Sequence, residues 1–160
     1  MTGDRQVQPS LSWQDLDLPP CPEPPGNFLP YTRSGGLVLL SGQTCKRGGR
    51  MLHTGQLGDS VTPAEAREAA RVCMLNLLAA LGEAVDRDWS RVRRCLRLTG
   101  YVNCAPGQPV VPEIIDGASD LVVALMGEAG RHARTSIGVA SLPGNAAVEV
   151  EAIFEIGDDS

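Results

Sequence analysis

The segment that most constrains the fold of this chain is residues 147–156, which read AVEVEAIFEI. Successive side chains of a β-strand point to opposite faces of a sheet. One face of this segment is therefore apolar, and it consists of Val148, Val150, Ala152, Phe154 and Ile156. The other face carries three glutamates beside one isoleucine. Such a strand fits a sheet with one face packed against helices and one face that a second subunit could cover.

Two amphipathic helices are predicted to pack on that apolar face. The first has a clear start, because Thr62 suits the N-cap, Pro63 the first helical position and Glu65 the capping box. Apolar residues, many of them alanine, then recur at helical spacing as far as Gly82 or Val85. This helix should therefore lie close against its support. The second helix is predicted over residues 112–126, followed by a glycine that ends it.

The remaining pattern predicts strands over residues 35–43, 92–103 and 135–140, with short strands around a turn in residues 45–56. The order strands, helix, strand, helix, strand, strand favours an α+β two-layer sandwich, in which two helices cover one face of one mixed sheet. The sequence LPGN at residues 142–145 is typical of a turn. If the last two strands pair, this turn would close a fairly tight hairpin.

Residues 1–25 are expected to form an extended, proline-rich arm, and residues 26–160 a single domain. A chain of 160 residues with 42% hydrophobic content suits one domain with one core. The arm is not expected to be a free tail. It carries four large apolar residues that should pack onto the body of the domain: Leu11, Trp13, Leu16 and Leu18.

Composition and charge exclude several classes of protein. The net charge of −5 disfavours broad nucleic-acid binding, since a phosphate backbone would meet a mostly repulsive surface. Five cysteines without CxxC spacing argue against a disulfide framework and a zinc site, and the two histidines lack metal-ligand spacing. The longest apolar run, LVLL, is far too short to cross a bilayer, and the N-terminal residues contain no signal-peptide core. We therefore expect a cytoplasmic, soluble protein without a metal and without a membrane or nucleic-acid partner.

Four stretches together resemble the Rid family, the reactive intermediate deaminases, also called the YjgF family. They are SGQ after the first strand, AARVCMLNLLAAL and GASDL in the two helices, and ARTSIGVASLPGNAAVEVEAIFEI at the C-terminal end. The resemblance covers about residues 25–156 and is closest to a longer branch of the family. It implies a chorismate-mutase-like fold that assembles as a homotrimeric barrel with pockets between subunits. It also implies hydrolysis of 2-imino acids, or their enamine tautomers, to 2-keto acids and ammonia, with no cofactor.

The resemblance assigns two catalytic residues. Arg134 matches the family arginine that binds the substrate carboxylate, and Glu149 matches the glutamate that orients the attacking water. The chemistry fits, because a guanidinium binds a carboxylate through two parallel N–H groups, and a nearby carboxylate can relay protons for water. Without the resemblance, Arg134 reads as a solvated strand end, and Glu149 as one of several outward glutamates. Whether the two side chains share a face depends on the strand register.

Four further residues are predicted to bind substrate. Ser41 matches the family serine before GQ, Phe28 stands in place of the usual tyrosine, and Ser136 in place of the usual cysteine. Asp116 stands in place of an asparagine, so it would repel a substrate carboxylate unless it is paired or protonated. It could instead suit an amine group, or be simply a first-turn helix acid stabilised by the helix dipole. Ser136 is either a pocket donor or a small strand residue. His132 either adds positive potential at the pocket mouth or is a solvated loop residue.

The sequence thus predicts a homotrimeric enzyme that hydrolyses a small carboxylate-bearing imine or enamine. The alternative is a non-catalytic trimer that binds a small carboxylate metabolite, or a pathway-specific tailoring protein on the same scaffold. The departures at Phe28 and Asp116 motivate that alternative. A ribonuclease or translation inhibitor, labels often attached to this family, is disfavoured by the acidic pI of about 5.0 and the missing aromatic-basic pattern.

Overall fold

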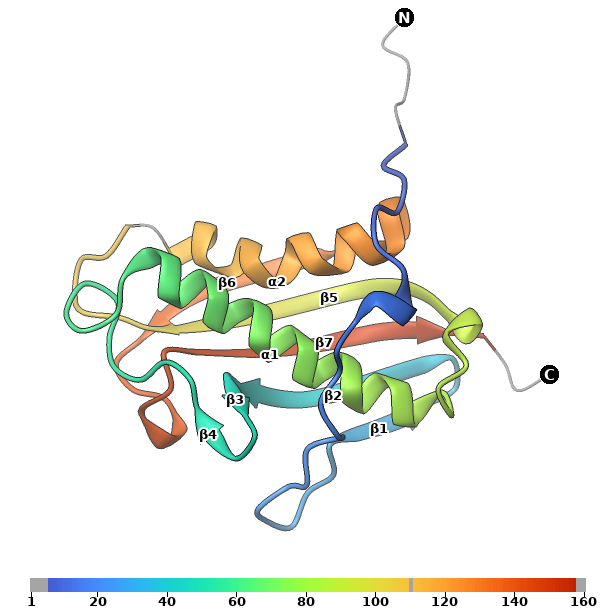
Figure 1. Cartoon of the computed structure of the whole chain (residues 1–160), viewed down its shortest axis with the longest axis horizontal. Helices are drawn as coiled ribbons and strands as arrows, with labels where there is room; N and C mark the ends of the chain where they lie inside the picture. The colour runs from blue at the N-terminus through green and yellow to red at the C-terminus, as the bar shows by residue number, and fades with distance from the viewer. Residues whose placement is uncertain (1–5, 110, 158–160) are drawn as a thin grey trace, which may run out of the picture.

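The computed structural model describes residues 6–109 and 111–157, which form two layers (Figure 1). The first layer is a mixed five-stranded sheet of order β1-β2-β7-β5-β6. Only β5 and β6 pair in parallel; the other neighbours are antiparallel. The strands are β1 (Tyr31–Ser34), β2 (Leu37–Thr44), β5 (Val92–Asn103), β6 (Ala133–Val139) and β7 (Val148–Ile156). A small separate ribbon pairs β3 (Lys46–Arg47) with β4 (Arg50–Met51).

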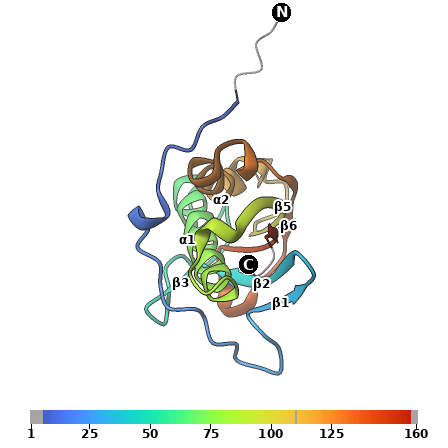
Figure 2. The same cartoon turned by 90° about the vertical axis from the view of Figure 1, so that its right-hand side faces the viewer.

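The second layer consists of helices α1 (Pro63–Ala84) and α2 (Val111–Met126), which lie side by side on one face of the sheet (Figure 2). The start of α1 is the predicted capping box: the Thr62 side chain accepts from the Glu65 amide, and the Glu65 carboxylate accepts from the Thr62 amide. Helix α1 packs on β2 and β7, and α2 on β5 and β6. The predicted two-layer α+β architecture is confirmed.

The alternation of β7 decides which face of the sheet is buried. Its apolar residues are between 0% and 4% exposed beneath the helices. Glu149, Glu151 and Ile153 point to the opposite face, which no element of the described chain covers. That open face also carries the exposed side chains of Leu39 and Ile137. The pattern confirms a sheet with one packed face and one open, partly apolar face.

The last two strands do not form the hairpin that the LPGN turn indicated. Strands β6 and β7 lie on either side of β5, so they do not pair. The cause is helix α2, which connects β5 to β6 as a crossover and returns the chain parallel to β5 at the sheet edge. The following connection then crosses the end of β5. There Asn103 donates through its amide nitrogen to the Asn145 side chain, and its backbone N–H donates to the Ala147 carbonyl.

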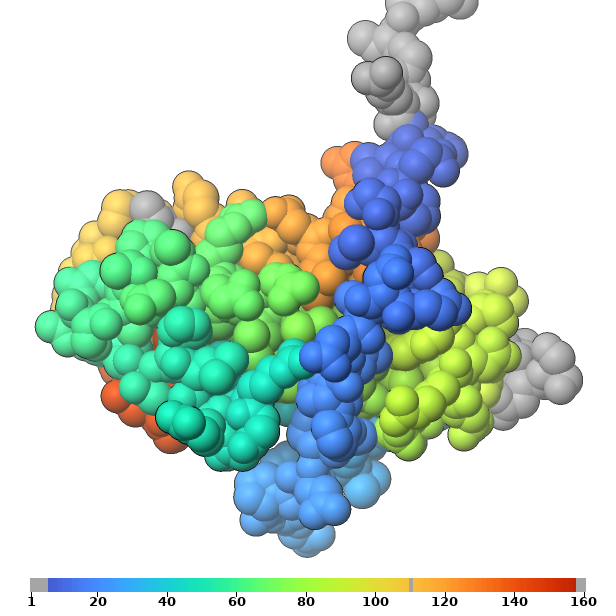
Figure 3. All heavy atoms as spheres, in the orientation of Figure 1, coloured from blue at the N-terminus to red at the C-terminus, as the bar shows by residue number. Residues whose placement is uncertain are grey.

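The N-terminal arm lies across the helices rather than free of them (Figure 3). The amides of Ser10 and Leu11 both donate to the Ala124 carbonyl near the end of α2. Further along, Trp13 stacks on Trp89 with ring centroids 4.3 Å apart and an interplanar angle of 5°. As expected, Trp13, Leu16 and Leu18 pack against the core, whereas Leu11 is 40% exposed.

Neither helix of the described chain combines the length and the apolar character needed to cross a bilayer. The cysteines at positions 21, 45, 73, 95 and 104 are all free. Burial raises the pKa of Cys95 to about 12 and also raises that of the fully buried Cys73. These two thiols are therefore core residues and not nucleophiles, as the sequence indicated.

Replacing Trp13 with alanine should loosen the arm while leaving the domain folded. The change removes the stack on Trp89, and we expect a loss of about 1–2 kcal/mol in the free energy of unfolding by urea. Limited digestion with proteinase K, followed by mass spectrometry, should show faster cleavage within residues 6–25. Leu11→Ala is the control, because that side chain is 40% exposed and takes no part in the stack. Equal cleavage of both variants and wild type would show that the stack does not hold the arm.

Candidate active site

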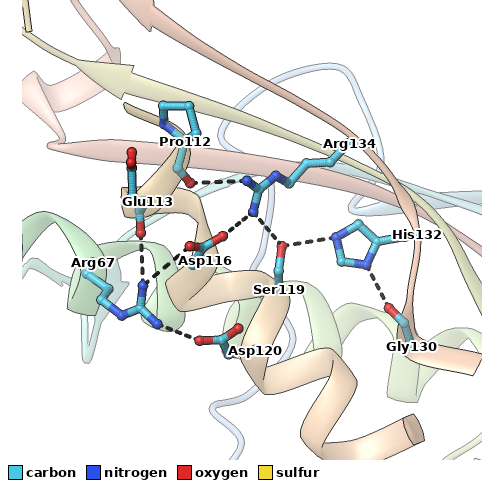
Figure 4. A network of polar contacts seen from close by, with 9 residues as sticks. All are labelled: Arg67, Pro112, Glu113, Asp116, Ser119, Asp120, Gly130, His132 and Arg134. Carbon is cyan, nitrogen blue, oxygen red and sulfur yellow. Dashed lines mark hydrogen bonds and ion pairs between the residues drawn. The ribbon is translucent and has the colours of Figure 1, made fainter. Parts of the chain in front are cut away.

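Arg134 lies on the edge strand β6 and points into the helix layer. Its backbone is paired in parallel with Leu98 on β5, and paired residues on neighbouring strands share a face of the sheet. Leu98 is fully buried beneath the helices, so Arg134 extends towards α2 (Figure 4). The position at the sheet edge leaves its side chain 25% exposed.

Three acceptors from α2 hold the Arg134 guanidinium. Its Nη1 donates to Asp116 Oδ1 at 2.6 Å and to Ser119 Oγ at 3.1 Å, and its Nη2 donates to the Pro112 carbonyl at 3.2 Å. We call this set, the Asp116 and Ser119 side chains and the Pro112 carbonyl, the Arg134 clamp. Arg134 is therefore not a solvated strand end. Asp116 is not a first-turn helix acid either, because α2 begins at Val111 and its first-turn acid is Glu113. Asp116 is the ion-pair partner of the predicted substrate-binding arginine.

His132 contacts the clamp through Ser119. Its Nδ1 lies 2.7 Å from the Gly130 carbonyl, and its Nε2 lies 3.0 Å from Ser119 Oγ. A carbonyl only accepts, so Nδ1 carries the proton, and in the neutral ring Nε2 accepts from the Ser119 hydroxyl. Burial lowers the pKa of His132, and the Arg134 charge lowers it further against the effect of the Gly130 bond. His132 is therefore neither a solvated residue nor a source of positive charge near neutral pH.

A second arginine extends the network to α1. Arg67 donates through Nη1 to the Glu113 carbonyl at 2.9 Å, and its Nη2 lies 2.5 Å from Asp120. Its Nη1 also lies 3.9 Å from Asp116 Oδ2. The helices approach closely here because position 117 is glycine: a Cβ would collide with the Arg67 carbonyl. The network thus joins α1, α2 and β6 around one carboxylate (Figure 4).

Glu149 lies on the open face of the sheet, beside the irregular part of β2. The β2–β7 register shifts between Leu40 and Gln43, and a Cβ at Gly42 would collide with Glu149 Oε1. The preceding residue, Ser41, donates to the Leu29 carbonyl at 2.6 Å. Burial raises the pKa of Glu149, and the neighbouring Glu151 raises it further. A carboxylate with a raised pKa is a stronger proton acceptor than an exposed glutamate.

The predicted site residues therefore fall into two groups within one chain. Arg134 and Ser136 lie on β6 and face α2, and Asp116 lies on α2 itself. The Ser136 hydroxyl is buried without a hydrogen-bond partner among the described residues. Ser41 and Glu149 form the second group on β2 and β7, together with Phe28, which is 51% exposed just before β1.

These two groups do not meet within a single subunit. Arg134 pairs with Leu98 and Glu149 with Tyr101, three positions along β5 and on the opposite face. The hairpin that could have joined them across a short turn is absent, because β5 separates their strands.

Sequence reasoning missed two parts of the clamp, Ser119 and the Pro112 carbonyl, and the supporting contact of His132. Asp116 and Ser119 stand three residues apart on a helix, so they share a face, and this spacing could have identified Ser119. For His132 the sequence left open a pocket-mouth or a loop position, and its contact with Ser119 gives it a third role. The Pro112 carbonyl carries no sequence signal, because its role depends only on where the first turn of α2 meets β6.

A hollow of about 500 Å³ lies next to the Arg134 group, at the ends of β5 and β6. Its volume is within the range of small-molecule pockets. Val111, directly before the clamp carbonyl, and Gly138, two residues after Ser136, contribute to it. The full lining is Gln56, Cys104, Ala105, Pro106, Gly107, Gln108, Val111, Gly138, Val139 and Ala140. Among the described residues, no three His, Cys, Asp or Glu side chains gather in a way that could hold a metal ion.

Comparison with known proteins gives the class of this fold. A family model described as "YjgF/chorismate mutase-like, putative endoribonuclease" matches residues 9–156. Protein TCP17 of Trypanosoma cruzi is 40% identical over 156 residues, which are 96% of each chain. The crystal structure of Atu1372 from Agrobacterium tumefaciens, a protein of unknown function, is 40% identical with a TM-score of 0.84. It covers 90% of this chain and 88% of its own.

The same fold is found at greater distance. The Rid-family protein YyfA from Yersinia pestis, of unknown function, has a TM-score of 0.62 at 18% identity and covers 84% of this chain and 92% of its own. The chain therefore belongs to the YjgF family, whose members are also called Rid proteins. The family and the chorismate-mutase-like fold that the sequence motifs indicated are both confirmed.

His132 should make stability fall as the pH decreases. Its pKa is lowered in the folded state, so below about pH 6.5 the unfolded chain takes up the proton first and unfolding is favoured. His132→Asn removes this effect, and its melting temperature should fall less than that of wild type between about pH 7 and pH 5. Arg131→Gln keeps His132 and should follow the wild-type profile. A His132→Asn profile as steep as that of wild type would contradict a neutral His132.

Proposed function

We propose that this protein hydrolyses a small 2-imino acid, or its enamine tautomer, to a 2-keto acid and ammonia in the cytoplasm. The observation that supports it best is the position of Arg134, a firmly held but partly exposed guanidinium at the edge of the sheet. A guanidinium in this setting binds a carboxylate and fixes the adjacent carbon for attack. Family membership adds support, because the family model matches residues 9–156 and the motifs around Arg134 and Glu149 resemble those of the family's functional residues.

The active site would form between subunits of a homotrimer. The Arg134 group lies at the β6 edge, whereas the Glu149 group lies on the open face towards β1 and β2. A head-to-tail contact joins two different surfaces of the same chain, and its repetition closes a ring. Such a contact would bring the β6 edge of one copy to the β1–β2 side of the next. The exposed Leu39 and Ile137 give that face the apolar character of a subunit contact.

The proposed reaction needs proton transfers only. Arg134 holds the carboxylate, and Glu149 accepts a proton from water as the water oxygen bonds to the imine carbon. Glu149 then passes that proton to the imine nitrogen. The resulting tetrahedral intermediate carries hydroxyl and amino groups on that carbon. Glu149 then takes the proton of the hydroxyl group and passes it to the amino nitrogen, so that the C–N bond breaks and ammonia leaves as the carbonyl forms. The raised pKa of Glu149 makes its carboxylate a stronger acceptor for the protons that it takes.

A second candidate is a trimer that binds a small carboxylate without hydrolysing an imine. Two features favour it. Phe28 lacks a hydroxyl that could contact the imine or a water, and Asp116 neutralises much of the Arg134 charge within the chain. A protein that acts on a pathway-specific ligand with the same scaffold would share these features.

Imine hydrolysis can be tested directly. We would generate 2-iminopropionate in situ with an amino-acid oxidase and alanine, and follow pyruvate release. Arg134→Ala should lower kcat/KM by about 100-fold or more, because carboxylate binding and orientation are lost. Glu149→Gln should lower kcat by about 100-fold or more with little change in KM, because it removes a proton acceptor. Arg131→Ala, a neighbouring exposed arginine, should behave as wild type.

The other functions give different results in the same experiment. No acceleration by wild type, combined with a melting temperature that pyruvate raises in wild type but not in Arg134→Ala, would favour the binding protein. RNA degradation that persists in Arg134→Ala would contradict both proposals. Sedimentation tests the shared site, since an active monomer would show that it is not formed between subunits.

A further inference from the structure

The hydrogen bonds of Arg134 leave one edge of its guanidinium free. A guanidinium has five N–H donors, of which two are on each Nη and one on Nε. Both donors of Nη1 are used, by Asp116 and Ser119, and one donor of Nη2 is used by the Pro112 carbonyl. Within residues 6–109 and 111–157, the Nε–H and the second Nη2–H have no hydrogen-bond partner.

The two free donors are geometrically related. In Figure 4 the Pro112 and Asp116 oxygens approach the end of the guanidinium and Ser119 approaches it from one side, while the opposite side is unoccupied by the drawn residues. That side is the edge shared by Nε and Nη2. Its two N–H bonds are parallel and match the spacing of the two oxygens of one carboxylate. One bidentate carboxylate therefore fits without displacing any clamp bond.

Asp116 has two separable effects on such a site. Its Oδ1 fixes the plane of the guanidinium at 2.6 Å, which lowers the cost of orienting Arg134 when a ligand binds. Its negative charge, 39% exposed, also reduces the attraction of Arg134 for any anion. The next acid on α2, Asp120, differs in that it pairs with Arg67.

We propose that the Arg134 clamp presents the Nε–H/Nη2–H edge to the substrate, and that Asp116 is a positioning residue for this one-carboxylate site. This inference rests on the proposed function only in taking the ligand to be a carboxylate. It also accounts for Asp116 where the family has asparagine. An asparagine would keep the acceptor for Nη1 and omit the charge. In this chain the arginine therefore holds its ligand by geometry more than by net charge.

The test compares two substitutions that both remove the charge. Asp116→Asn keeps an acceptor for Nη1, whereas Asp116→Ala keeps none, so their difference reports positioning alone. With pyruvate as the probe in calorimetry, Asp116→Ala should bind about fivefold more weakly than Asp116→Asn, the value of one neutral hydrogen bond. Ser119→Ala, which keeps the charge and removes a different acceptor, should bind about two- to fivefold more weakly than wild type. Arg131→Ala, an exposed arginine whose ion pair is with Glu128, should bind as wild type does.

The free edge can be observed without catalysis. In a ¹⁵N–¹H spectrum, the Arg134 Nε–H resonance is the one that disappears in Arg134→Lys. It should shift on addition of pyruvate to wild type and to Asp116→Asn. A resonance that does not move while backbone signals shift would overturn the proposal. The proposal would also be overturned if Asp116→Asn and Asp116→Ala bound pyruvate equally well and Ser119→Ala bound it as wild type does. Failure of the wild-type protein to bind pyruvate would overturn it as well.

These outcomes separate the inference from the proposed reaction. If wild type does not hydrolyse 2-iminopropionate but the Nε–H shift and the Asn-to-Ala difference are found, positioning holds and the hydrolase proposal fails. If hydrolysis depends on Arg134 but Asp116→Asn and Asp116→Ala have the same kcat/KM and the Nε–H does not respond, the reaction holds and the inference fails.

Discussion

The structure depends on the burial of one apolar sheet face beneath two closely packed helices. Strand β7 lies in the middle of the sheet and contributes five side chains that are at most 4% exposed, and both helices pack on that face. Small residues allow the close packing, since a Cβ at position 117 would strike the backbone of α1. This contact fixes α2 over the sheet edge, and the position of α2 in turn decides where its first turns meet Arg134. The candidate site is thus a consequence of helix packing.

Much of the fold follows from local sequence patterns. The alternation in residues 147–156 identifies the buried and open faces of β7, and the Thr62 capping box marks the start of α1. Both patterns are predictive because the atoms that satisfy them lie within a few residues. The position of β6 was not predictable in this way. The turn sequence at residues 142–145 indicates that the chain reverses, but not whether the strands on either side of the turn are neighbours in the sheet. The crossover through α2 places β5 between β6 and β7.

The candidate site likewise has parts that local sequence patterns predict and parts that they do not. The family motifs identified Arg134 and Glu149, but sequence reasoning could not show that they face opposite sides of one sheet. The role of Asp116 was open between repulsion, an amine contact and a helix-dipole effect, and only its 2.6 Å contact to Arg134 decides for an ion pair. Such contacts depend on register between distant segments, which alternation and spacing do not encode. The Pro112 carbonyl, a backbone group, is the extreme case.

The position of the arm decides which surface of the molecule is available for contacts with other subunits. Its first described residues cross the helix layer, and the uncovered sheet face lies on the opposite side of the molecule. Backbone hydrogen bonds to Ala124 attach the arm to α2, and the stack of Trp13 on Trp89 attaches it to the segment that follows α1. Any assembly built through the sheet would therefore keep the arm, from residue 6 onwards, on its outer surface. A label attached to an exposed residue of the arm would lie outside the contact between subunits.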